Sequence, residues 1–113
     1  MPASIADVTE WLEAQVDKEL LVSKQEDDDL DEVRIRLGSV EHRAAKENAL
    51  DDYTDSAALL LRGMGTVVTE GREAALPMDT FEIPLEGLSL TETADDAALL
   101  VTERARYKIE IGR

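Results

Sequence analysis

The chain has 113 residues, of which 43% are apolar and 4% aromatic, so we expect one modest core of mostly aliphatic side chains. Its 26 acidic and 12 basic residues give a formal net charge of -14, which disfavours binding to nucleic acid or to an anionic membrane surface. The absence of cysteine excludes disulfides, thiolate nucleophiles and cysteine-based metal sites.

The first residues lack the basic, apolar and small-residue order of a signal peptide. The longest unbroken apolar runs, residues 57–61 and 97–101, are far too short to span a membrane. We therefore expect a cytoplasmic protein that makes no contact with the membrane. Acidic residues greatly outnumber lysines, which suits either a salt-rich cytoplasm or an ordinary acidic domain.

Residues 4 to about 23 predict one amphipathic helix. Ser4 is suited to the N-cap, and Asp7 three residues later completes an approximate capping box. Apolar side chains then recur at helical spacing, at Ile5, Val8, Leu12, Val16 and Leu20. Trp11 lies beside this stripe, and we expect its indole in the core.

Residues 24–31 (K-Q-E-D-D-D-L-D) predict an acidic linker, and an antiparallel sheet is expected from about 32 to 111. The sheet begins with a half-buried strand in which Val33, Ile35 and Leu37 alternate with Arg34 and Arg36. The alternation changes parity after Gly38, which predicts a bulge there.

The stretch from Ser56 to Thr69 is the most apolar and least charged window, and it predicts a central strand buried on both faces. Glu70 and Gly71 follow as a short turn. The chain then returns through residues 74–85, where Pro77 and Pro84 favour an edge strand with a break near Met78.

A short strand is possible around residues 88–90, and a long last strand is expected over about 97–111. On this last strand Leu99, Val101 and Tyr107 would share a buried face, while Arg104 and Arg106 would share the exposed one. The predicted fold is one α+β domain over residues 1–113. In it the N-terminal helix packs on one face of a roughly four-stranded antiparallel sheet.

Familiar motifs fail at their most demanding positions. The run from Asp27 to Asp31 resembles the start of a calcium loop, but Glu32 stands where glycine is needed. Gly63 and Gly65 match half of a dinucleotide fingerprint, without the third glycine or a following helix. His42 is the only histidine, which excludes a multi-histidine metal site within one chain. We expect no metal and no cofactor.

The basic strand residues are the best candidates for a ligand site. Arg34 and Arg36 share one strand face, and Arg104 and Arg106 share another, so neighbouring strands would form a basic stripe that receives a carboxylate or phosphate. His42 is a further ligand-binding or general-base candidate. The alternative is that these cations only pair with glutamates on adjacent strands.

The function favoured by these patterns is a non-catalytic interaction module. A helix covers only one face of the predicted sheet, and a second copy would cover the other, so we expect a homo-oligomer or a protein partner. The alternative is a small anionic-ligand binder or enzyme that uses the strand arginines or His42. A nucleic-acid mimic remains a third hypothesis, resting on net charge alone.

Overall fold

The computed structural model describes residues 4–43, 46–48, 53–55 and 57–112, and within them it contains one α-helix and ten strands. The helix is α1 (Ile5–Glu13), and a short 3-10 turn, η1, spans Pro77–Asp79. The strands are β1 (Glu19–Glu26), β2 (Asp29–Arg43), β3 (Lys46–Asn48), β4 (Tyr53–Asp55), β5 (Ala58–Thr69), β6 (Arg72–Ala75), β7 (Thr80–Pro84), β8 (Leu90–Thr93), β9 (Ala97–Val101) and β10 (Arg106–Ile111).

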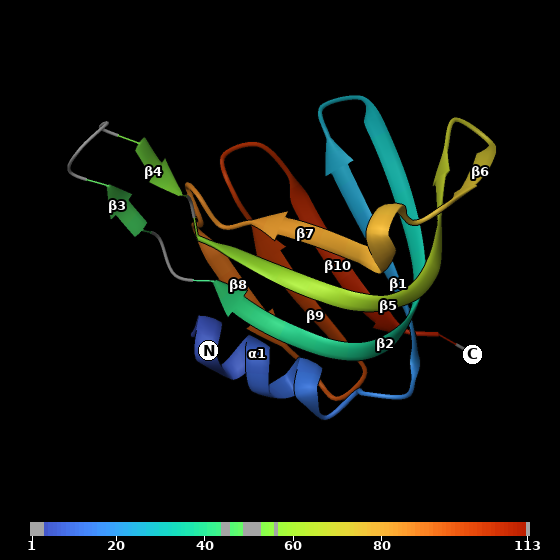
Figure 1. Cartoon of the computed structure of the whole chain (residues 1–113), viewed down its shortest axis with the longest axis horizontal. Helices are drawn as coiled ribbons and strands as arrows, with labels where there is room; N and C mark the ends of the chain where they lie inside the picture. The colour runs from blue at the N-terminus through green and yellow to red at the C-terminus, as the bar shows by residue number, and fades with distance from the viewer. Residues whose placement is uncertain (1–3, 44–45, 49–52, 56, 113) are drawn as a thin grey trace.

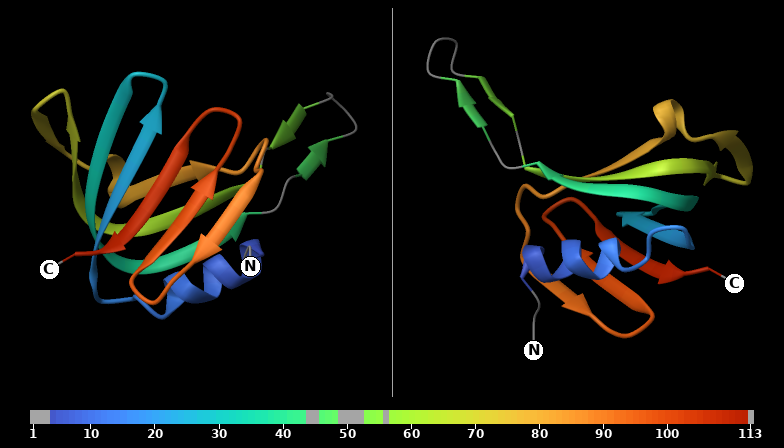
Figure 2. Two further views of the ribbon diagram at one scale, coloured as in Figure 1. Left: turned by 180° about the vertical axis from the view of Figure 1, so that it is seen from behind. Right: turned by 60° about the horizontal axis from the view of Figure 1, so that its bottom comes forward.

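Eight strands form one antiparallel sheet, and seven of them follow the order β6-β5-β2-β1-β10-β9-β8. The eighth strand, β7, pairs with the first half of β5, and β6 pairs with the second half of the same edge. The two remaining described strands, β3 and β4, form a separate hairpin. That hairpin projects away from the main sheet (Figure 2). The prediction of a helix on a four-stranded sheet is therefore wrong, because the described residues are mostly strand and the helix is short.

The large sheet curls so strongly that its two halves face each other. In Figure 1, β5 and β7 pass in front of β9 and β10, and α1 lies along the lower end. The rings of Phe81 on β7 and Tyr107 on β10 touch across the interior. The sheet covers its own inner face in this way, and the interior forms one hydrophobic cluster to which α1 contributes Val8 and Leu12.

The helix begins where the sequence predicts and ends much earlier. The Ser4 hydroxyl accepts from the Asp7 backbone N–H, and the Ser4 N–H donates to the Asp7 carboxylate, which completes the capping box. These bonds to Ser4 lower the pKa of Asp7. The helix stops at Glu13, and Asp17 with φ 74° turns the chain into β1.

The prediction of a helix to residue 23 and an acidic linker over 24–31 is wrong. Leu20 fits the helical spacing, yet Leu20 and Val22 also alternate with period two, and the backbone pairs them with β2 and β10 on either side. The acidic run is the tip of the β1–β2 hairpin, in which Glu26 pairs with Asp29. Asp27, Asp28 and Asp29 at this tip are exposed, so the hairpin accommodates their charges.

The expected bulge at Gly38 is confirmed, because the pairing of β2 with β5 shifts register between Leu37 and Ser39. Gly63 and Gly65 lie on β5 against this strand. A Cβ at either position would collide with the backbone carbonyl oxygen of Arg36 or Arg34. The glycines therefore permit close strand approach, and neither forms part of a phosphate-binding loop.

The prolines mark a sheet edge, as expected. Pro77 begins η1, whose Met78 has φ 53°, so the returning segment breaks there into β6 and β7. Both strands pair only with β5 among the described residues. Pro84 is the last residue of β7, an edge strand, so the backbone N–H that proline lacks is not needed for pairing inside the sheet.

The predicted long last strand is two strands. The Thr102 hydroxyl accepts from the backbone N–H groups of Arg104 and Ala105, at 3.3 and 3.1 Å, and closes a turn between β9 and β10. This turn reverses the chain and changes which parity faces the core. Leu100 and Tyr107 are buried, whereas Leu99 lies on the opposite, outward surface.

Candidate functional site

The outer face of the sheet is the surface turned away from the core, and it carries most of the basic residues predicted for a site. Arg34 and Arg36 lie on β2 and Arg106 lies on β10, with β1 between them. These three side chains are exposed. The expected basic stripe is therefore interrupted by one strand.

Two cations of this face already have acidic partners. Arg34 Nη1 lies 3.4 Å from Glu19 Oε1, and Lys108 Nζ lies 3.6 Å from Glu110 Oε1. All four side chains are about half exposed, so each ion pair contributes little to stability. Part of the basic stripe therefore pairs with glutamates of the same chain, which is the alternative to a ligand site.

The remaining two predicted site residues lie elsewhere. His42 is exposed near the end of β2, beyond the bulge, and it makes no ion pair or hydrogen bond with another described residue. Arg104 sits in the β9–β10 turn. The structure therefore does not bring His42, Arg104 and the strand arginines together, and no anion site is built from all five.

A shallow groove lies on the outer face over β8, β9 and β10, with a volume of about 370 Å³. Its floor is small and apolar, formed by alanines of β9, and Leu99 stands half-buried beside them. Lys108 and Arg106 border it on β10, and Glu92 borders it on β8. The groove is thus an apolar strip with bases along one side and an acid on the other.

The pairing register aligns these groups in a row. Leu99 pairs with Lys108 on one side and with Glu92 on the other. The next row holds Val101 between Arg106 and Leu90. In both rows the β9 side chain is a half-buried hydrophobic residue on the outward surface.

On the outward side of β5, Leu60 is buried by side chains of neighbouring strands of the same chain. Leu60 is only 8% exposed, and it pairs with Glu41 on β2 and Glu82 on β7. Arg62 lies 2.7 Å from Glu41 and Arg43 lies 3.3 Å from Glu82. The stems of these side chains shield Leu60. Burial of β5 on both faces is therefore confirmed for Ala58–Leu61, while Met64 further along is 77% exposed.

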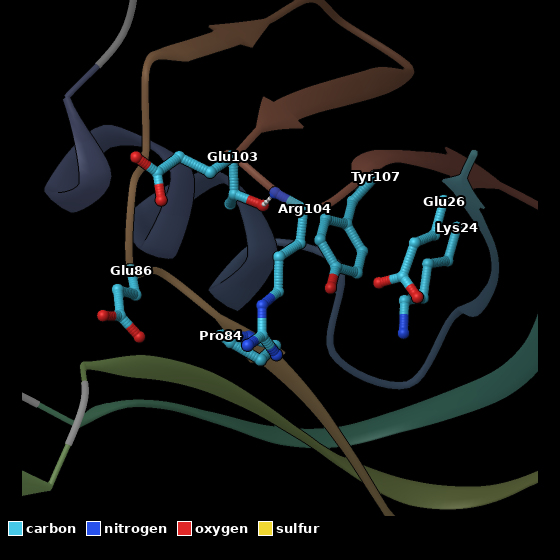
Figure 3. Close-up of a pocket in the computed structure, with 8 residues that line it drawn as sticks. Lys24, Glu26, Pro84, Glu86, Glu103, Arg104 and Tyr107 are labelled. Atoms are coloured by element: carbon cyan, nitrogen blue, oxygen red, sulfur yellow. Dashed lines mark hydrogen bonds between the residues drawn. The ribbon is translucent and has the colours of Figure 1, made fainter.

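A second hollow opens at the mouth of the curled sheet, the end of the interior opposite α1. It has a volume of about 170 Å³ and lies between the tip of β1, the β9–β10 turn and the loop after β7 (Figure 3). Lys24 and Glu26 come from β1, where they continue the inward face of Leu20 and Val22. Arg104 lies in this hollow.

Tyr107 forms part of the wall of the mouth. Its side chain is only 3% exposed, and its ring meets that of Phe81 edge to face. Burial raises the pKa of the Tyr107 hydroxyl; the charge of Glu26 adds to the rise, and Arg104 acts against it. The hydroxyl therefore keeps its proton at neutral pH.

Several of these residues were not predicted as functional. Leu99 was assigned to the buried face because the β9–β10 turn, which changes the parity, has neither glycine nor proline. Glu92 on β8 received no role. Lys24 and Glu26 were assigned to a linker. Their alternation with Leu20 and Val22 is the sequence signal that would have placed them on one strand face.

The described part of the chain holds no group of three or more histidine or acidic side chains arranged to bind a metal ion. None of its helices has the length and apolar character needed to cross a membrane.

Comparison with known proteins places the chain among its relatives. The family model described as YmzB-like protein matches residues 1–113. The chain belongs to the YmzB-like family. Within it, the chain is 34% identical over 110 residues to the "Uncharacterized protein YmzB" of Bacillus subtilis (strain 168), covering 92% of each chain. No solved structure matches this YmzB-like chain.

Proposed function

We propose that this protein is a non-catalytic interaction module that self-associates through the outer face of β8, β9 and β10. One observation carries the proposal: Leu99 stands half-buried in an exposed groove, aligned in one row between Glu92 and Lys108. An apolar strip with opposite charges on its two sides is complementary to a rotated copy of itself.

The register indicates how two copies would meet. A two-fold axis lying between the sheets and parallel to β9 places β8 of each copy over β10 of the other. Glu92 then faces the partner's Lys108 twice, and Leu99 faces the partner's Leu99 on the axis. Sheets that pack face to face lie about 10 Å apart, which gives room for these side chains.

The other in-plane axis, perpendicular to the strands, is unfavourable. It would place β8 over β8 and β10 over β10, so Glu92 would meet a second Glu92 and Lys108 a second Lys108. Like charges facing each other at an interface are destabilising. The charges therefore favour one arrangement of a dimer over the other.

Hydrophobic contact would supply the attraction. Ala97, Val101 and Leu90 extend the strip around Leu99, and each is half-buried in the single chain. Burial of apolar surface contributes roughly 25 cal/mol per Å². The charged rows on either side would then set the orientation more than the affinity.

The support for a non-catalytic role is chemical. His42, the only histidine, lies exposed and without an acidic partner among the described residues. The described carboxylates likewise form no cluster suited to hold a metal. Arg34 and Arg36 share the outer face of β2, whereas Arg106 lies on β10 and Arg104 lies in the β9–β10 turn, so the four arginines do not converge on one reacting group.

Size-exclusion chromatography with light scattering tests the proposal. We expect the wild-type chain to reach the mass of two copies as concentration rises, and Leu99→Lys to stay at 12.5 kDa. Met64→Lys is the matched control, since Met64 is exposed on the same sheet face over β5, outside the groove. A wild-type chain that stays monomeric at every concentration contradicts self-association, and an effect of Met64→Lys equal to that of Leu99→Lys contradicts the assignment to β8–β10.

A further inference from the structure

The mouth pocket contains a tyrosine hydroxyl that no other described residue hydrogen-bonds. Tyr107 is only 3% exposed as a residue, and its hydroxyl makes no hydrogen bond with another described residue. In Figure 3 this hydroxyl points into the hollow beside the Arg104 side chain. No fully shielded side-chain polar atom of the described residues lacks a partner, so solvent reaches this hydroxyl from the hollow, and a ligand in the hollow can replace that solvent as its hydrogen-bond partner.

The charged side chains around this hydroxyl are also unpaired. Lys24 and Arg104 supply positive charge, and three glutamates supply negative charge, Glu26, Glu86 and Glu103. None of the five forms an ion pair within 4.0 Å of another described residue, although ion pairs such as Arg62 with Glu41 form elsewhere among the described residues. In Figure 3, Glu86 and Glu103 lie on one side of Arg104, with Lys24 and Glu26 on the other.

The pocket is held in shape by short-range structure. Thr102 fixes the turn that carries Glu103 and Arg104 through hydrogen bonds to the backbone of Arg104 and Ala105. Gly87, with φ 74°, lies against the Glu103 side chain, where a Cβ would collide with it. The ring of Phe81 holds that of Tyr107. A pocket whose groups are already positioned loses little entropy when a ligand binds.

The balance of charge excludes most ligand classes. A simple anion would meet three carboxylates within a chain of net charge -14. A simple cation would meet Arg104 and Lys24. A molecule that carries both charges, a carboxylate and an ammonium a few bonds apart, satisfies both sets. A hollow of about 170 Å³ is the size of a small free amino acid, rather than a nucleotide.

We propose that the mouth pocket binds a small zwitterion of the free amino-acid class. Arg104 and the Tyr107 hydroxyl donate hydrogen bonds to its carboxylate, and Glu103 and Glu86 accept from its ammonium group. Burial keeps the Tyr107 hydroxyl protonated, so it remains a donor across the neutral range. This site is separate from the groove over β9, and either proposal can fail without the other.

Binding is tested by isothermal titration calorimetry and by the NMR signals of the Tyr107 ring. The probes are glycine, L-alanine and L-serine, with acetate and ethylamine each carrying one of the two charges alone. We expect one of the amino acids to bind one per chain and to shift the Tyr107 signals, and acetate and ethylamine to bind at least about tenfold more weakly.

Variants identify the groups responsible. We expect Arg104→Gln and Glu103→Gln each to weaken binding about tenfold or more, and Tyr107→Phe to weaken it about threefold to tenfold. Arg72→Gln and Glu73→Gln are the matched controls, since both residues are exposed on β6, away from the mouth, and neither should change affinity. Tyr107→Phe keeps the ring that packs on Phe81, so its fold is preserved.

Three outcomes overturn the proposal. In the first, no amino acid in the panel shifts the Tyr107 signals at millimolar concentration. In the second, acetate or ethylamine binds as tightly as the amino acids. In the third, binding occurs but is unchanged by Arg104→Gln and Tyr107→Phe, which places it elsewhere on the molecule.

Discussion

The rings of Phe81 and Tyr107 meet edge to face, with centroids 6.5 Å apart and planes at 65°, although β7 and β10 belong to opposite halves of the sheet. No backbone ladder joins β7 to β10, so side-chain contacts such as this one join the two halves of the sheet across the core. Aromatic pairs of this geometry are worth about 0.5–1.5 kcal/mol beyond the area they bury.

Truncation of this contact should therefore weaken the fold. We expect Phe81→Ala to lower the free energy of unfolding by about 2–4 kcal/mol, measured by urea denaturation. Met78→Ala is the control, since Met78 is 94% exposed on the same sheet edge and should change stability by less than about 0.5 kcal/mol. Equal effects of the two variants would show that the ring pair does not hold the halves together.

The raised pKa of Tyr107 makes stability depend on alkaline pH. Because the folded state favours the protonated hydroxyl, Tyr107 contributes stability below its unfolded pKa of about 10, and this contribution is lost as pH rises through the higher folded pKa. Tyr107→Phe should thus lose stability less steeply above about pH 10. The difference in ultraviolet absorbance between wild type and variant isolates this phenol, and a midpoint at or below 10 would contradict the burial argument.

Trp11 joins α1 to the sheet, because its Nε1–H donates to the Ala94 carbonyl oxygen at 2.8 Å while its ring packs partly buried against the core. We expect Trp11→Ala to lower the free energy of unfolding by about 3–5 kcal/mol. Trp11→Phe should fall between this variant and wild type, since it keeps a ring and loses the hydrogen bond. A loss below about 1 kcal/mol for Trp11→Ala would mean that α1 contributes little to the core.

Stability should rise with added salt. The net charge of -14 produces repulsion within the folded chain, and ions at about 1 M screen it to about 3 Å, compared with about 10 Å at 0.1 M. The four ion pairs of the described residues are substantially exposed, so little attraction is lost when salt screens them. The test compares thermal midpoints at low salt and in about 1 M sodium chloride, and a falling midpoint would show that attraction outweighs repulsion.

The start of the helix could be predicted from the sequence because capping is local. Ser4 and Asp7 lie three residues apart and bond to each other whatever the rest of the chain does. The end of the helix could not be predicted, because Leu20 fits both a helical spacing and the alternation of a strand. Pairing with β2 and β10 decides in favour of the strand, and those partners lie about 15 and 91 residues further along the chain.

The candidate site was less predictable than the fold elements. Arg34, Arg36 and Arg106 were correctly assigned to exposed strand positions, as alternation with buried residues implies. Arg104 and Leu99 were assigned to the wrong faces, because a threonine side chain, rather than glycine or proline, closes the turn between them. The row that joins Glu92 to Lys108 depends on strand register, which no local pattern specifies.

Self-association through β8–β10 is tested most directly by exchanging the two charges that border Leu99. Light scattering should report dimers for the wild-type chain, monomers for Glu92→Lys and for Lys108→Glu, and dimers again for the double variant. In the double variant each new lysine would face a new glutamate of the partner, so attraction returns. Single variants that still form dimers, or a double variant that stays monomeric beside a dimeric wild type, would contradict the proposed pairing of β8 with β10.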